Sequence, residues 1–94
     1  MINEEILTFL KALSNEKRME IVLLFLSRNE VTVNQVAEII GIGQSTASEQ
    51  LAILKRAGLL LSRKEGTIVY YSPNKSKAME LLQKLTNVLT DCCK

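Results

Sequence analysis

The chain has 94 residues, of which 47% are hydrophobic and 23% charged, and its formal net charge is +2. This length and balance are typical of one compact domain and argue against a disordered chain. Histidine is absent, and the only cysteines are Cys92 and Cys93. Imidazole bases, histidine-ligated metal sites, zinc fingers and a disulfide framework are therefore excluded.

Targeting segments are not evident. No apolar run approaches the roughly 18 residues that span a bilayer. Residues 1–5 carry two acids and no base, so no secretory signal is visible. We therefore expect a cytoplasmic protein that does not enter the membrane.

Positive charge is concentrated in one third of the chain. Between Leu51 and Lys77 six bases stand against the single acid Glu65, a balance of +5. Such a concentration is expected if one face meets a polyanion, although a solvated basic surface would carry the same charge.

Two helices are predicted at the start of the chain. Apolar residues recur at helical spacing over residues 2–13, which predicts an amphipathic helix. Ser14 or Asn15 then offers an N-cap for a second helix. Its apolar residues, all between 19 and 26, lie on nearly every side of the helix, which predicts a buried element. Val31 follows as a short strand residue.

The middle of the chain predicts two helices joined by a glycine turn. Thr32 and Gln35 have the spacing of a capping box, which opens a helix that ends at Ile40. Residues 41–43, Gly-Ile-Gly, form a tight turn that positive φ at glycine allows. A further helix then runs over residues 44–57, with its alanine and leucine positions inward.

A hairpin follows this helix pair. Gly58 ends the preceding helix in the C′ position. Residues 59–65 and 67–72 alternate well enough for two strands, with Glu65-Gly66 as the turn between them. Pro73 stops the second strand because it cannot donate to the ladder.

A last amphipathic helix, capped by Asn74 or Ser76, completes one domain over residues 1–94. The fold class is therefore mainly α with a small β-hairpin (α+β). It is a winged helix-turn-helix of five helices and a two-stranded wing.

This order of elements favours DNA binding. The second helix of such a pair enters the major groove, and a basic wing lies along the backbone or the minor groove. Short polar side chains on that helix let its backbone approach the bases. Glu49 could accept from cytosine N4 or point to solvent. The expected DNA-binding residues are Gln44, Ser45, Thr46, Ser48, Glu49, Arg56, Arg63, Lys64 and Thr67.

Four stretches together resemble the ArsR-type (ArsR/SmtB) family of winged helix-turn-helix repressors: Leu10–Arg18 (LKALSNEKR), Gln44–Ser48 (QSTAS), Leu51–Leu59 (LAILKRAGL) and Arg63–Tyr71 (RKEGTIVYY). The resemblance implies a homodimer whose first and last helices form the interface. It also implies a near-palindromic operator in double-stranded DNA, near its own or a neighbouring gene, and repression relieved by an inducer. Apolar stripes agree with that dimer, because a chain of this size has little core for them to cover. The expected interface residues are Ile2, Ile6, Leu10, Leu81, Leu85 and Val88.

The chain departs from the metal-sensing members of that family. Their cysteine motif on the third helix is missing from Val33–Glu38, and histidine ligands are absent throughout. Cys92 and Cys93 remain as a candidate site for a soft metal or metalloid, or for thiol oxidation. Alternatively, Cys92 only extends the apolar stripe of the last helix.

Two other function classes are alternatives to a sequence-specific regulator. One is a winged-helix module that binds DNA without sequence preference, or binds a protein, and senses no ligand. The other is an enzyme, which we do not expect, because no base stands ready to activate a thiol and no phosphate loop stands out.

Overall fold

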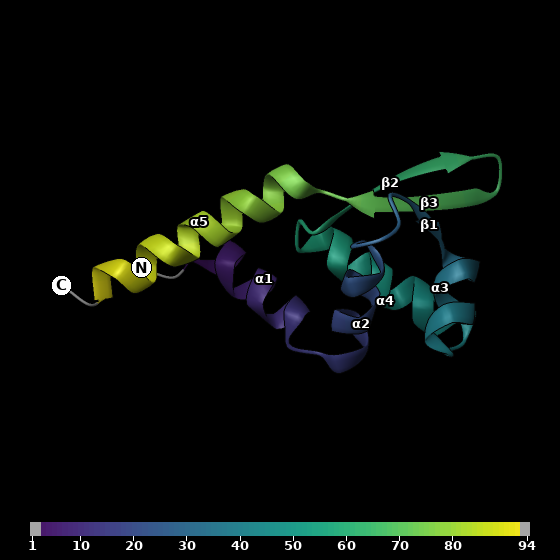
Figure 1. Ribbon diagram of the computed structural model, residues 1–94, viewed down its shortest axis with the longest axis horizontal. Helices are drawn as coiled ribbons and strands as arrows, with labels where there is room; N and C mark the ends of the chain where they lie inside the picture. The colour runs from purple at the N-terminus through teal and green to yellow at the C-terminus, as the bar shows by residue number, and fades with distance from the viewer. Residues whose placement is uncertain (1–2, 93–94) are drawn as a thin grey trace.

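The computed structural model describes residues 3–92, and of Cys92 only its place in the backbone. Over that range the elements are α1 (Glu4–Leu13), α2 (Glu16–Leu24), β1 (Val31–Thr32), α3 (Val33–Ile40), α4 (Gln44–Arg56), β2 (Leu60–Glu65), β3 (Ile68–Pro73) and α5 (Lys75–Cys92). Figure 1 shows α2, α3 and α4 gathered beside the small sheet, with α1 and α5 together at the other end. The expected fold class is confirmed. Among these helices none combines the length and apolar character that a membrane span requires.

Local hydrogen bonds explain where the helices begin. The side chain of Asn15, one of the two expected caps, accepts from the backbone N–H of Arg18 at the start of α2. The capping box of α3 is complete, because Thr32 accepts from the Gln35 N–H while Gln35 accepts from the Thr32 N–H. These bonds satisfy backbone donors that a helix start leaves unpaired.

The helix α2 is less buried than its composition predicts. Ile21 is fully buried, whereas Leu23 is 52% exposed and Leu26, beyond the end of the helix, is 83% exposed. The expectation of an all-round buried helix was therefore wrong. One side of α2 packs on α1, α3 and α4, while Leu23 on the other side remains exposed within residues 3–92.

The sheet has one strand more than the predicted hairpin. Its order is β1-β3-β2 with antiparallel pairing throughout, and β1 pairs Val31 with Tyr71. The turn between β2 and β3 lies one residue later than expected, at Gly66-Thr67. Gly66 has φ +61°, and positive φ in the first turn position suits a type II′ hairpin.

A Schellman motif ends α4 at Gly58 and places α5. The Gly58 N–H donates to the Lys55 carbonyl and the Leu59 N–H to the Leu54 carbonyl. Gly58 has φ +90°, and a Cβ there would lie 2.9 Å from Lys77 Cγ and 3.5 Å from Leu81 Cδ1. Glycine is thus required both by the backbone and by the close approach of α5.

The helices α1 and α5 form a second packed unit. Ile6 and Phe9 of α1 and Leu81 of α5 are buried. Around them Glu5 accepts from Lys77 at 2.6 Å and from Lys84 at 2.9 Å, and Glu80 pairs with the same two lysines. The hydrogen bond from Lys77, followed by that from Lys84, lowers the pKa of Glu5 to about 2.

This network predicts a pH dependence of stability. A carboxyl whose pKa is lowered by folding stabilises the fold above its unfolded pKa and loses that contribution as the pH falls through its folded pKa. Glu5→Gln should therefore lower the melting temperature at pH 7, and the difference from the parent should shrink between pH 4.5 and about 2. Glu4→Gln, in the same helix turn but without an ion pair in residues 3–92, is the control. A difference that persists at pH 2 would contradict the network.

Candidate nucleic-acid interface

The first two turns of α4 present a polar surface. Gln44, Ser45, Thr46, Ser48 and Glu49 are all exposed. On the opposite side Ala47, Leu51 and Leu54 are completely buried in the core that α4 shares with α3. The core side of α4 thus fixes which side chains face outward, as the helical spacing predicts.

The start of α4 also offers unpaired backbone donors. Gly41, with φ +79°, ends α3, and Gly43 is the N-cap of α4 without a side-chain hydrogen bond. The first N–H groups of α4 therefore face solvent uncapped by any side chain of residues 3–92. Such a helix start favours a phosphate oxygen through its N–H groups and its dipole.

The wing divides its two adjacent bases between opposite faces of the sheet. Successive strand residues point to opposite faces. Ser62, which accepts from the ammonium group of Lys55 in α4 at 2.7 Å, marks the face toward that helix. Lys64 shares the face of Ser62, and Arg63 points to the other. Both are exposed, but they have different surroundings.

Arg63 is held by the protein itself. Its Nε donates to Glu30 at 2.9 Å and its Nη2 to the other oxygen of Glu30 at 2.8 Å, while Nη1 pairs with Glu65. The guanidinium lies 4.4 Å from the centre of the Tyr70 ring, a cation–π distance. The hydrogen bond from Arg63 lowers the pKa of the Glu30 carboxyl. Two acids therefore offset the charge of Arg63, whereas Lys64 has no ion pair within residues 3–92.

Arg56 lies apart from the other expected residues. The helical wheel puts it on the side of Ser45, but eleven residues of helix separate the two by about 16 Å along the axis. Arg56 lines a cavity together with Glu4, Glu5 and Thr8 of α1. The structure thus places it beside α1, away from the start of α4. Thr67, at the tip of the wing, is exposed as expected.

Arg18 is a positioning residue that the sequence did not reveal. Its guanidinium donates to the carbonyl of Ala12 at 2.8 Å, to that of Lys11 at 3.2 Å and to the side chain of Gln50 at 2.8 Å. It thereby links the end of α1 to the middle of α4. Only the position of Arg18 in the Leu10–Arg18 motif hinted at its importance, since its partner Gln50 is 32 residues away.

The expected interface residues fall into two groups. Ile6 and Leu81 are buried between α1 and α5 of the same chain, so neither is available to a partner. Leu10, Leu85 and Val88 are half-buried, and Ile2 lies outside the described residues. The apolar side chains that α1 and α5 leave exposed are instead Leu7, Met79, Leu82 and Leu89.

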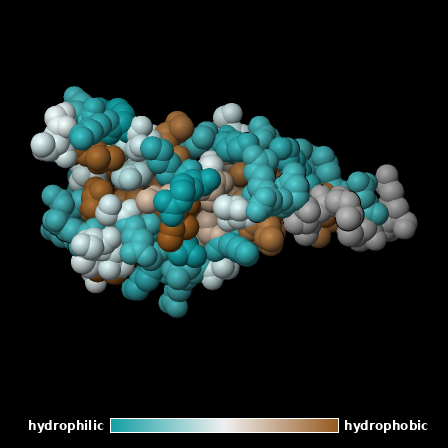
Figure 2. Space-filling view, turned by 180° about the vertical axis from the view of Figure 1, so that it is seen from behind, coloured by the Kyte–Doolittle hydropathy of each residue, from teal (hydrophilic) through white to brown (hydrophobic). Residues whose placement is uncertain are grey.

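Figure 2 shows hydrophobic side chains emerging along one side of the projecting helix, between hydrophilic ones. On α5, Leu82, Leu85 and Leu89 follow one another at helical spacing and form a stripe. We call Leu7 of α1 with Leu82, Leu85 and Leu89 the terminal-helix stripe.

The candidate sensor residues lie at the edge of what the structure describes. The side chain of Cys92 and all of Cys93 are outside it. Within the described residues no group of three or more histidine, cysteine, aspartate or glutamate side chains could hold a metal ion.

Comparison with known proteins gives related sequences of known class. The family model described as "Bacterial regulatory protein, arsR family" matches residues 15–62, from the N-cap of α2 to the middle of β2. The transcriptional activator HlyU of Vibrio cholerae is 42% identical over 79 residues, 81% of this chain and 72% of HlyU. A cadmium resistance regulatory protein, the CadC homolog of Staphylococcus aureus, is 39% identical over 79% of this chain. The match spans only 61% of that protein.

The similar solved structures belong to the same class of regulator as the related sequences. A homodimeric winged helix-turn-helix DNA-binding domain from Mycobacterium bovis has a TM-score of 0.73 and 34% identity, covering 94% of this chain and 80% of that one. HlyU from Vibrio cholerae has a TM-score of 0.67 and 39% identity, covering 86% and 90%. The chain belongs to the arsR family of bacterial regulatory proteins.

Proposed function

We propose that the protein is a homodimeric transcriptional regulator that binds a near-palindromic operator through the start of α4 and through Lys64. The observation that carries this proposal is the exposed, uncapped start of α4 beside a wing whose Lys64 has no ion pair within residues 3–92. Polar side chains there reach base edges, while Lys64 and the first N–H groups of α4 bind phosphate.

The terminal-helix stripe supports the dimer. In a single chain three leucines of this stripe, Leu7, Leu82 and Leu89, are between 43% and 58% exposed. Pairing of two chains across a two-fold axis would cover them. Two copies of α4 then face half-sites about one helical turn apart. The homodimeric state of the Mycobacterium bovis domain favours the same arrangement.

We further propose that the protein represses transcription by occupying its operator. Among its relatives, one from Xylella fastidiosa is called a biofilm growth-associated repressor, while HlyU is called an activator. The proposal assigns the chain no catalytic role and places it in the cytoplasm, where bacterial DNA lies. It leaves the two terminal cysteines, Cys92 and Cys93, as candidates for an inducer that binds thiols.

The two wing bases are expected to respond differently to alanine substitution. The logarithm of the DNA association constant falls linearly with the logarithm of the salt concentration. Lys64→Ala should make this slope less steep by about 0.9, because one phosphate contact and its released counterion are lost. Arg63→Ala should leave that slope unchanged, because Glu30 and Glu65 already neutralise the guanidinium. Both slopes are measured by fluorescence anisotropy over a salt series, with a DNA duplex that has been selected for binding from a random pool.

Lys11→Ala, which removes an exposed lysine of α1, is the matched control and should not change the slope. An equal loss for Arg63→Ala and Lys64→Ala would mean that Arg63 leaves Glu30 to bind phosphate. An unchanged slope for Lys64→Ala would remove the wing from the interface. Equal affinity for the selected duplex and a random one would favour a module without sequence preference.

A further inference from the structure

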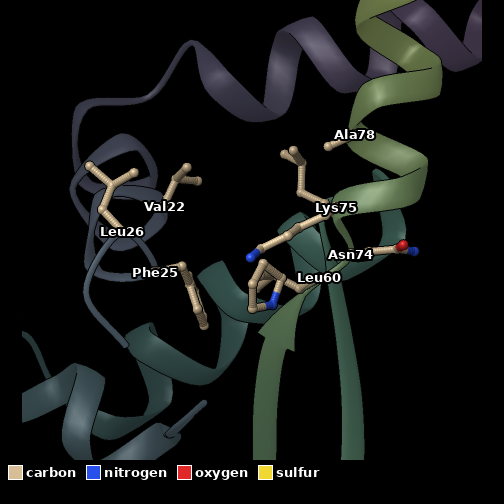
Figure 3. A pocket seen from close by; sticks show the side chains of 9 residues that line it. Val22, Phe25, Leu26, Leu60, Asn74, Lys75 and Ala78 are labelled. Carbon is tan, nitrogen blue, oxygen red and sulfur yellow. The ribbon is translucent and has the colours of Figure 1, made fainter. Parts of the chain in front are cut away.

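An apolar groove lies where α2, the sheet and α5 meet. Its volume is about 290 Å³. Its walls include Val22 of α2 with Phe25 and Leu26 just beyond the end of that helix, and Leu60, Pro73 and Ala78 opposite. Figure 3 shows these side chains surrounding an open space between the end of α2 and the start of α5. We call this space the α2–α5 groove. At roughly 30 Å³ for each water-sized atom, it holds a ligand body of about ten heavy atoms.

One cation stands at the mouth of the α2–α5 groove. The side chain of Lys75 reaches from the start of α5 across the opening toward Phe25, while Asn74 points away (Figure 3). Asn74 caps α5 by accepting from the Lys77 N–H. Lys75 is exposed and has no ion pair or hydrogen bond within residues 3–92. By contrast, Lys77 and Lys84 of the same helix are paired with Glu5 and Glu80.

We propose that the α2–α5 groove binds a small apolar carboxylate, with its hydrocarbon body between Phe25 and Ala78 and its carboxylate on the ammonium group of Lys75. Apolar walls with one placed polar group are typical of small-molecule sites. The carboxylate of such a ligand complements Lys75, the only charged side chain among the described residues that line the groove.

The position of the groove suggests a regulatory role, and this part of the proposal rests on the proposed function. Its walls come from α2, which packs against α4, from the base of the wing, and from the helix that carries the terminal-helix stripe. A ligand there contacts the base of the wing and the dimer helix directly, and it reaches α4 through α2. Its binding therefore changes operator affinity if the DNA-bound and the DNA-free protein bind the ligand unequally.

Octanoate is the probe, and octanamide, its uncharged isostere, is the control ligand. NMR titration of methyl-labelled full-length protein should show saturable shifts at Val22, Leu26 and Ala78, with one site per chain. Octanoate should bind at least about fivefold more tightly than octanamide. Hexanoate should bind more weakly than octanoate, by about fourfold for each methylene that no longer enters the groove.

Lys75→Met keeps an apolar stem and removes the charge, so it should abolish the preference for octanoate over octanamide. Lys64→Met, the same change on the wing, should preserve that preference. Ala78→Leu narrows the groove and should weaken both ligands. A preference retained in Lys75→Met, or shifts that cluster elsewhere, would overturn the site. The site would also be overturned if no shifts appeared because a second copy of the chain covers the groove.

Regulation is tested separately, with the selected duplex. Saturating octanoate should change operator affinity by at least about fivefold in the parent and not in Lys75→Met. Octanoate binding without this change would overturn the regulatory role and keep the site. If no duplex is bound even without ligand, the proposed function fails, whereas the NMR titration still decides the groove.

Discussion

Replacing Leu82 and Leu89 by glutamate should convert the protein to monomers and weaken operator binding by about 10²–10⁴-fold, the advantage that linking two binding units confers. Both side chains are about half exposed in one chain and lie on the terminal-helix stripe. A carboxylate at each position would have to be buried without a partner, which opposes association. Analytical ultracentrifugation and anisotropy titration measure the two effects.

The matched control is the double variant Gln83→Glu, Asn87→Glu. These exposed residues hydrogen-bond to each other on another side of α5, and the change adds the same charge to the same helix. It should leave both mass and operator affinity close to those of the parent. A Leu82→Glu, Leu89→Glu protein that stays dimeric would rule out the terminal-helix stripe as the interface.

Gly58→Ala should destabilise the fold by about 2–4 kcal/mol, the sum of a left-handed backbone strain of roughly 1–2 and a packing cost of similar size. The new Cβ would meet Lys77 Cγ at 2.9 Å. Moving Lys77 would disturb its ion pairs with Glu5 and Glu80. Urea denaturation at equal chain concentration gives the change in the free energy of unfolding.

Gly66→Ala separates strain from packing. Gly66 also has a positive φ, +61°, but a Cβ there would have no neighbour within 4 Å. Its cost should therefore be the backbone strain alone, about 1–2 kcal/mol. Equal losses of stability in Gly58→Ala and Gly66→Ala would contradict the close approach of α5 to the end of α4.

Features that depend on neighbours in sequence could be predicted. The capping box at Thr32 and the left-handed glycines Gly41 and Gly58 are set within a few residues, and the structure confirms them. The outward positions of α4 follow from the spacing of Ala47, Leu51 and Leu54, which are all buried. Local patterns were therefore enough to place the helix pair and the wing.

Features that depend on distant partners could not be predicted. A short strand residue was expected at Val31, but its pairing was not, because its partner Tyr71 lies 40 positions later. The exposed side of α2 depends on which helices cover it. The composition counted Arg63 with the free bases, but Glu30, 33 residues upstream, neutralises it. A charge count along the chain thus overestimates the positive surface that the fold presents.

Selection of bound duplexes from a random pool tests the central claim most directly. Two copies of α4 related by a two-fold axis should enrich an inverted repeat whose half-sites are centred about 10–11 base pairs apart. Enrichment of a single unrepeated half-site, or of no sequence at modest salt, would contradict a dimeric operator-binding regulator.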